Sequence, residues 1–145
     1  AVDPYFITAV YPTESKLIAT ARGINNYKSL WCAEKVKTTI LEFELQNRRE
    51  PVVAMMGLAF KPNIDDLRES PSKNIVSRVI QICNNADILI VEPNVNEHSQ
   101  FKLTDYRDAY DKADIVVMLT AHDQFKSLPY DESRVILDFC GVYRK

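Results

Sequence analysis

The stretch VVAMMGLAFKPNIDDLRESP, residues 52–71, decides the fold of this chain. It begins with an apolar run, residues 52–59, of the kind that forms a strand buried on both faces of a parallel sheet. It ends with Ser70 and Pro71, a helix cap followed by proline at the first helical position. The stretch therefore predicts a strand, a polar loop and a helix, in that order.

The same alternation continues to the end of the chain. Three more apolar runs follow, at residues 88–91, 115–119 and 135–137, separated by helical stretches that include residues 105–112 and 123–127. In the helix after Pro71, one face is formed by the apolar residues Ile75, Val76, Val79 and Ile80. Strands that alternate with helices predict an α/β fold with a Rossmann-like parallel sheet and flanking helices.

Upstream of the sheet, residues 24–50 contain neither proline nor glycine and predict one long helix. Its apolar residues recur every three or four positions, at Ile24, Tyr27, Trp31, Ala33, Val36, Ile40 and Phe43. Such a helix would run about 40 Å, which is longer than a small domain is wide. We expect part of this apolar stripe to pack on another domain or on a second copy of the chain. The alternative is a plain core helix.

Two features are expected before the long helix. A shorter helix over residues 16–22 is indicated by Thr13, a suitable N-terminal cap, and Gly23 is either its C-terminal cap or a kink. Nearer the start, Asp3 precedes Pro4, and proline disfavours helical geometry in the residue before it. We expect Asp3 to lie in an extended segment or a turn.

The composition is that of one globular domain with a net charge close to zero. The 145 residues are 46% hydrophobic and 26% charged, with a net charge of −2. This balance, with no run of basic residues, makes nucleic acid an unexpected partner. No apolar stretch has the roughly 20 residues that cross a bilayer, and the start lacks the pattern of a signal peptide. We expect a soluble, cytoplasmic protein without a membrane partner.

The cysteines Cys32, Cys83 and Cys140 form no CxxC pair and lie far apart. This spacing is typical of reduced thiols and does not indicate a disulfide framework or a zinc site, so we expect no metal.

The sequence opens at Ala1 without an initiator methionine. We therefore expect a piece of a longer protein.

The polar loop after residues 52–59 is the segment expected to carry chemistry. A dinucleotide site needs three glycines here and only Gly57 is present, so we expect no NAD site within this sheet. Lys61 and Arg68 offer two cations, and the helix that begins at Ser70 adds partial positive charge, a combination suited to a diphosphate. The alternative is a solvated loop in which both cations pair with Asp65, Asp66 and Glu69.

Three other polar residues carry weaker signals. Glu92 ends the second apolar run, where nucleotide-binding folds place an acid for a ribose, but without the glycine fingerprint a simple strand-end turn is favoured. His98 and His122 lie in polar surroundings with no nucleophile at a readable spacing. We interpret both as surface histidines.

The segment from Gly57 to Pro71 resembles the start of the C-terminal domain of the UDP-glucose/GDP-mannose dehydrogenase family. The resemblance lies in the pair Phe60-Lys61 and in Asp-Asp-x-Arg-x-Ser-Pro, residues 65–71. It extends to residues 2–6, similar to the segment just after the family's catalytic cysteine. It also covers residues 21–26, at the entry to the central helix, and 138–143, at the last strand. Val-Asp-Pro-Tyr, residues 2–5, resembles the branch that acts on UDP-N-acetylhexosamines, in particular UDP-N-acetylmannosamine.

The resemblance implies a division of the chain and an activity for its parent. Residues 1–50 would be the helical central region that pairs subunits into homodimers, truncated after an upstream catalytic cysteine. Residues 51–145 would be the UDP-sugar-binding domain. The parent would oxidise the sugar's C6 alcohol to a carboxylate in two NAD-dependent steps, through a thioester, for surface polysaccharide synthesis. NAD would be held mainly by an N-terminal domain that this chain lacks, so the fragment alone would be inactive.

Residue roles follow from the same resemblance. Asp3 matches a catalytic aspartate that assists water activation in the hydrolytic half of the reaction. Phe60 and Lys61 match the pair that contacts the UDP-sugar, and Arg68 matches an arginine that reaches the bound NAD. The chain departs from the family at Cys140, where many relatives carry a basic residue that binds the nucleotide-sugar, and Arg144 is a nearby candidate to substitute for it.

Two alternatives stay open. In the first, the parent is a dehydrogenase of the same class that acts on UDP-N-acetylglucosamine or UDP-glucose. In the second, the protein is not an enzyme but a nucleotide-binding or dimerisation module that shares the sheet and has no dehydrogenase half. The mass of the native protein separates these classes, because a dehydrogenase would be much larger than this chain.

Overall fold

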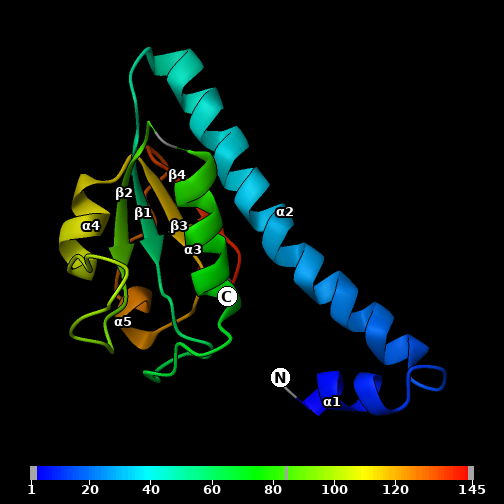
Figure 1. The fold of residues 1–145 in the computed structure, drawn as a ribbon. Coiled ribbons are helices and arrows are strands. Elements are labelled where there is room, and N and C mark those ends of the chain that lie inside the picture. Colours follow the sequence, from blue (N-terminus) through cyan, green and yellow to red (C-terminus); the bar gives the residue numbers. More distant parts are fainter. Residues whose placement is uncertain (1–2, 84, 144–145) are drawn as a thin grey trace.

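A computed structural model describes residues 3–83 and 85–143; Val2 and Arg144 lie outside these ranges. It contains a four-stranded parallel sheet in the order β2-β1-β3-β4 (Figure 1). The strands are β1 (Val52–Met56), β2 (Asp87–Val91), β3 (Ile115–Met118) and β4 (Val135–Asp138). The predicted α/β fold is confirmed.

Helices cover both faces of this sheet. Because side chains alternate along a strand, Val53 and Met55 of β1 face one layer, and Ala54 and Met56 face the other. The first layer holds α3 (Pro71–Ile82) and the C-terminal half of α2 (Lys16–Asn47), and the second holds α4 (Tyr106–Lys112) and α5 (Asp123–Lys126). The core is therefore formed on both sides of β1 and β3.

The predicted start of α3 is confirmed in detail. Ser70 is extended and fully buried, and its hydroxyl accepts the Lys73 N–H at 3.4 Å, with Pro71 in the first turn. At α4, the Asp105 carboxylate accepts the N–H groups of Arg107 and Asp108. Both caps satisfy backbone donors that a helix start leaves unpaired.

The N-terminal region differs from the prediction. Helix α1 (Asp3–Val10) begins at Asp3, so Asp3 is neither extended nor in a turn, and Pro4 is tolerated because it lies in the first helical turn. Helix α2 runs without a break through Gly23, so the alternative in which Gly23 caps a separate shorter helix is wrong. The residue at the N-terminal end of α2 is Ser15, not Thr13. A glycine inside a long helix costs only about 1 kcal/mol, which the neighbouring turns offset.

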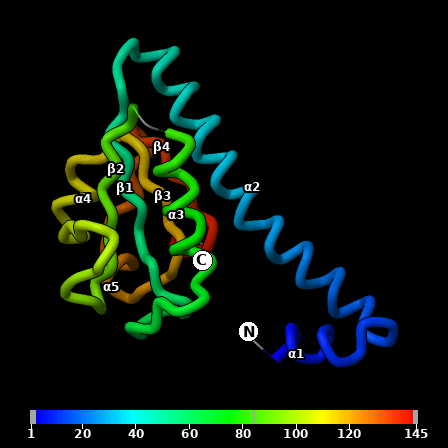
Figure 2. The backbone as a smooth tube through the Cα atoms, viewed as in Figure 1, coloured from blue at the N-terminus to red at the C-terminus, as the bar shows by residue number. Residues whose placement is uncertain are grey.

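Helix α2 packs on the sheet along only part of its length. Its buried residues lie in the C-terminal half: Cys32, Ala33, Val36, Thr39 and Ile40. Toward the N-terminus the helix leaves the body of the sheet and meets α1 at its far end (Figure 2). No helix of the described residues is both long and apolar enough to cross a membrane.

Candidate functional site

The carboxyl ends of the central strands meet at one edge of the sheet. Met56 of β1 is in register with Val91 of β2 and with Met118 of β3. Since β2 and β3 lie on opposite sides of β1, this edge is the point where the strand order reverses. Open parallel sheets bind ligands in the crevice that forms there.

Gly57 turns the chain from β1 into the loop at this edge. Its φ of +95° suits glycine, and a Cβ at this position would lie 2.7 Å from the Thr120 Cβ. Its N–H donates to the Val91 carbonyl at 2.9 Å, and the Thr120 hydroxyl donates to the Ala59 carbonyl at 2.9 Å. Only glycine permits this close approach between the loop and the end of β3.

Glu92 is a buried anchor for the loop, with 3% of its surface exposed. Its Oε2 accepts the N–H groups of Leu58 and Ala59, both at 2.8 Å, and its Oε1 accepts that of Asn94 at 3.1 Å. Burial raises the pKa of Glu92, but hydrogen bonds from His122 and from the N–H groups of Asn94 and Leu58 outweigh burial and lower the pKa overall. The expected strand-end turn is present, since Pro93 and Asn94 form a turn directly after Glu92, but the Glu92 side chain also anchors the loop, which the sequence did not predict.

His122 is fully buried beside Glu92, so its interpretation as a surface residue is also wrong. Its Nδ1 lies 2.9 Å from the Asn63 backbone nitrogen, which is a donor. Nδ1 is thus the acceptor, and the proton sits on Nε2, 3.2 Å from Glu92 Oε2. The Asn94 amide nitrogen also lies 2.9 Å from Nδ1, and the ring meets Phe125 edge-on.

Phe60 and Lys61 lie between these anchored positions. Phe60 is partly exposed, and its N–H donates to the Asp66 carbonyl at 2.9 Å. Lys61 is exposed, with its Nζ 5.7 Å from the centre of the Phe60 ring. Within residues 3–83 and 85–143, no carboxylate lies within ion-pair distance of Lys61. Its charge is therefore available to an anion.

Arg68 lies on the same loop but is paired. Its Nε and Nη2 each donate to the Asp66 carboxylate at 3.0 Å, and 88% of its side chain is exposed. The Arg68 hydrogen bonds lower the pKa of Asp66 to about 2. The alternative of a solvated, internally paired loop thus holds for Arg68 and not for Lys61.

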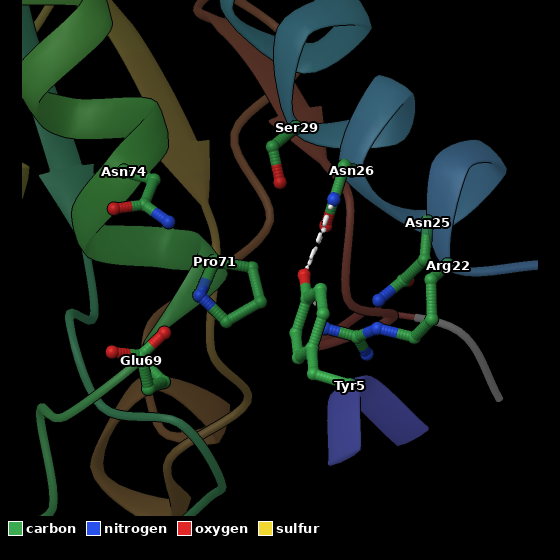
Figure 3. A pocket seen from close by; sticks show the side chains of 8 residues that line it. All are labelled: Tyr5, Arg22, Asn25, Asn26, Ser29, Glu69, Pro71 and Asn74. Atoms are coloured by element: carbon green, nitrogen blue, oxygen red, sulfur yellow. Dashed lines mark hydrogen bonds between the residues drawn. The ribbon is translucent and has the colours of Figure 1, made fainter. Parts of the chain in front are cut away.

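A polar pocket of about 280 Å³ separates α1 and α2 from the start of α3 (Figure 3). The Tyr5 hydroxyl accepts hydrogen bonds from Arg22 Nη2 at 3.0 Å and Asn26 Nδ2 at 3.3 Å, and these lower the pKa of Tyr5. The other lining residues are Asn25, Ser29, Glu69, Pro71 and Asn74. Asp3 is exposed on α1 and is not part of this lining. Among the described residues, no ion pair joins Asp3 to Lys61.

The turn after β4 is organised by Asp138. Its Oδ1 accepts the N–H groups of Cys140, Gly141 and Val142, and its Oδ2 accepts that of Tyr143. Burial raises the pKa of the Cys140 thiol to about 12, with the Asp138 charge adding to the effect. Cys140 is therefore a neutral thiol that offers neither positive charge nor a nucleophile.

The described part of the chain contains no group of three or more His, Cys, Asp or Glu side chains that could hold a metal ion.

Comparisons with known proteins agree with this architecture. Residues 54–145 match the model of the UDP-glucose/GDP-mannose dehydrogenase family, UDP binding domain. The whole chain is 39% identical to the UDP-N-acetyl-D-mannosamine dehydrogenase of Escherichia coli K12 over 155 residues, which cover 99% of the chain and 36% of that protein. It is 40% identical over 149 residues to the NDP-N-acetyl-D-galactosaminuronic acid dehydrogenase of Ralstonia nicotianae, with 99% and 34% covered.

A solved structure is similar over nearly the full length. The UDP-N-acetyl-mannosamine dehydrogenase of S. aureus superposes with a TM-score of 0.74 at 27% identity, covering 98% of this chain and 37% of that one. The chain therefore spans about a third of the length of the relatives it matches.

Proposed function

Because the chain belongs to the UDP-glucose/GDP-mannose dehydrogenase family, we propose that residues 51–145 bind the UDP half of a nucleotide-sugar. The parent enzyme is then an NAD-dependent UDP-sugar 6-dehydrogenase. The diphosphate lies against the loop of residues 57–70 at the carboxyl edge of the sheet. Lys61 neutralises its charge, and the partly exposed Phe60 ring packs on the ligand.

The observation that supports this proposal is that Lys61 is exposed and has no described carboxylate within ion-pair distance. The lysine projects from a loop whose backbone is tied on both sides to buried side chains, and no described carboxylate competes for its charge. A cation held at the switch point of a parallel sheet suits a phosphorylated ligand.

The proposal extends to Asp3, Arg68 and the cofactor. The single Gly57 after β1 gives this sheet no cradle for a dinucleotide, so we place the main NAD site in another domain of the parent enzyme. In the parent enzyme, Arg68 reaches from this domain to the NAD held by the other domain. To do so, Arg68 must leave Asp66. That exchange is inexpensive because the ion pair is exposed. Asp3 acts as the base that activates water in the hydrolytic step.

Binding of UDP by the 145-residue chain tests this proposal. In a calorimetric titration we expect saturable binding that Lys61→Ala weakens about tenfold to a hundredfold, the effect of losing a hydrogen bond to a charged group. Lys112→Ala is the matched control, since Lys112 is exposed at the opposite edge of the sheet. Equal affinities of the Lys61 and Lys112 variants would contradict the assignment of Lys61.

The sugar is proposed to be UDP-N-acetylmannosamine, supported by relatives of that name at 39% identity. The parent enzyme should then reduce NAD with this substrate at a higher kcat/KM than with UDP-N-acetylglucosamine or UDP-glucose. A preference for either of the other sugars would overturn this choice and leave the enzyme class intact.

A further inference from the structure

We propose that Glu92 and His122 are positioning residues that together fix the backbone of Phe60 and Lys61 for a nucleoside diphosphate. This inference rests on the proposed function, because it explains how the UDP-binding segment acquires its shape. Neither residue is expected to touch the ligand.

The pair holds both sides of the binding segment. Immediately before Phe60, the N–H groups of Leu58 and Ala59 donate to Glu92. Two residues after Lys61, the N–H of Asn63 donates to His122. The exposed stretch between these points, which contains Phe60 and Lys61, is therefore fixed at each end by a side chain from outside the loop.

The two anchors are also joined to each other. Glu92 follows β2 and His122 lies just beyond β3, so they come from the two strands that flank β1. Their side chains contact at 3.2 Å and both are buried. A displacement of either residue would therefore shift the other. The hydrogen-bonded Glu92–His122 pair thus holds the loop that follows β1.

The hydrogen bonds require these chemical groups. Three backbone N–H groups and the His122 Nε2–H converge on the Glu92 carboxylate, which offers acceptors only. A glutamine would turn an NH₂ group toward at least one of these donors. On His122, Nδ1 must accept while Nε2 donates, which is the neutral imidazole with its proton on Nε2.

Fixing the segment before the ligand arrives favours binding, since less backbone freedom is lost on association. Asn63 has a φ of +62°, a left-handed conformation that asparagine adopts more readily than other residues with side chains. The Asn63 side chain adds reciprocal hydrogen bonds with Asp123, at 2.9 Å each. Loss of the His122 acceptor should therefore loosen the segment without unfolding the domain.

Two substitutions of His122 separate its two nitrogens. In His122→Asn the amide oxygen takes the place of Nδ1 and keeps the acceptor for Asn63, whereas in His122→Gln the amide reaches the place of Nε2 and the Nδ1 acceptor is lost. In titrations of the 145-residue chain with UDP, we expect His122→Gln to bind about tenfold more weakly, as for one lost hydrogen bond, and His122→Asn to keep most of the affinity. His98→Gln is the control, because His98 bonds to the Gln100 N–H and not to the loop.

A second measurement records the anchoring itself. Without UDP, amide hydrogen exchange at Asn63 should accelerate in His122→Gln and not in His122→Asn, and exchange at Leu58 and Ala59 should accelerate in Glu92→Gln. A merely structural role would lower the stability of both His122 variants alike and give no such pattern. If Glu92→Gln fails to fold, the comparison of His122→Asn with His122→Gln still tests the positioning role.

The outcomes distinguish this inference from the proposed function. If the unchanged chain does not bind UDP, the proposed function fails, and this inference fails with it. If the unchanged chain binds UDP and both His122 variants bind as tightly, the proposed function stands and the positioning role is overturned. Rescue by asparagine and not by glutamine supports the role.

Discussion

Gly57 is the residue on which the path of the loop depends most. Gly57→Ala places a Cβ 2.7 Å from Thr120 at a φ of +95°, so it should lower the free energy of unfolding by about 2 kcal/mol or more. Gly23→Ala is the matched control with the opposite sign, because Gly23 lies inside α2 with open space around it. It should raise stability by about 0.5 to 1 kcal/mol. Urea denaturation measures both, and an unchanged midpoint for Gly57→Ala would contradict the close approach.

Asp138 should make stability depend on pH. Burial raises its pKa, but the N–H groups of Tyr143, Val142, Gly141 and Cys140 outweigh burial, and the folded pKa is lowered. A lowered folded pKa gives stabilisation that is present above the unfolded value of about 3.9 and is lost as the pH falls through the folded value. The advantage of the unchanged chain over Asp138→Asn should therefore shrink as the pH falls below about 4. Asp65→Asn, at an exposed carboxylate, serves as the control, and a constant difference would contradict this role.

The site residues differ in how far the sequence could predict them. Phe60, Lys61 and Arg68 stand in one contiguous motif, so their common loop was predictable. Glu92 and His122 were not, because their burial depends on β2 and β3 lying on either side of β1, an order that differs from the order along the chain. A usable signal is that each stands within a few residues of an apolar strand run, at the edge where parallel strands end together.

At the level of elements, an ion pair just beyond the C-terminal end of α2 adds to the packing of this helix on the sheet. Arg49 donates to both Asp114 oxygens, at 2.8 and 2.6 Å, and the Val52 N–H donates to Asp114 Oδ2 at 2.9 Å. This contact joins the helix end to the start of both β1 and β3.

A double-mutant cycle measures that ion pair. Asp114→Ala should lower the free energy of unfolding by about 1 to 2 kcal/mol, because it also leaves the Val52 N–H without its partner. The coupling to Arg49→Ala should be about 0.5 to 1 kcal/mol, since Arg49 is half exposed and water weakens the attraction. Strictly additive effects of the two substitutions would show that the ion pair does not hold α2.

The elements themselves were predicted with errors that have physical causes. The first apolar run continues to Ala59, yet β1 ends at Met56. Leu58 and Ala59 are fully or almost fully buried in the loop, so their apolar character reports burial and not strand geometry. Helix α1 was missed because none of its residues is buried, which leaves no amphipathic pattern to detect.

For the whole molecule, the exposed apolar side chains of α2 predict self-association. Ile24 and Tyr27 are 66% and 63% exposed, on the half of the helix that leaves the sheet. We expect sedimentation of the 145-residue chain to show a dimer, because burying these exposed apolar side chains between two copies stabilises the dimer by about 25 cal/mol per Å² of apolar surface. Tyr27→Glu should shift the chain to monomers, and Tyr130→Glu, at an equally exposed tyrosine in the loop between α5 and β4, should not. A strict monomer at micromolar concentration would contradict the dimer.

The central claim is that the Phe60–Lys61 loop binds the diphosphate of UDP, and amide chemical-shift mapping of the 145-residue chain tests it most directly. On addition of UDP, the account predicts saturable shifts concentrated in residues 57–63 and at the anchors Glu92 and His122, and their loss in Lys61→Ala. Shifts concentrated instead around the pocket of Tyr5 and Arg22, or no shifts at all, would contradict it.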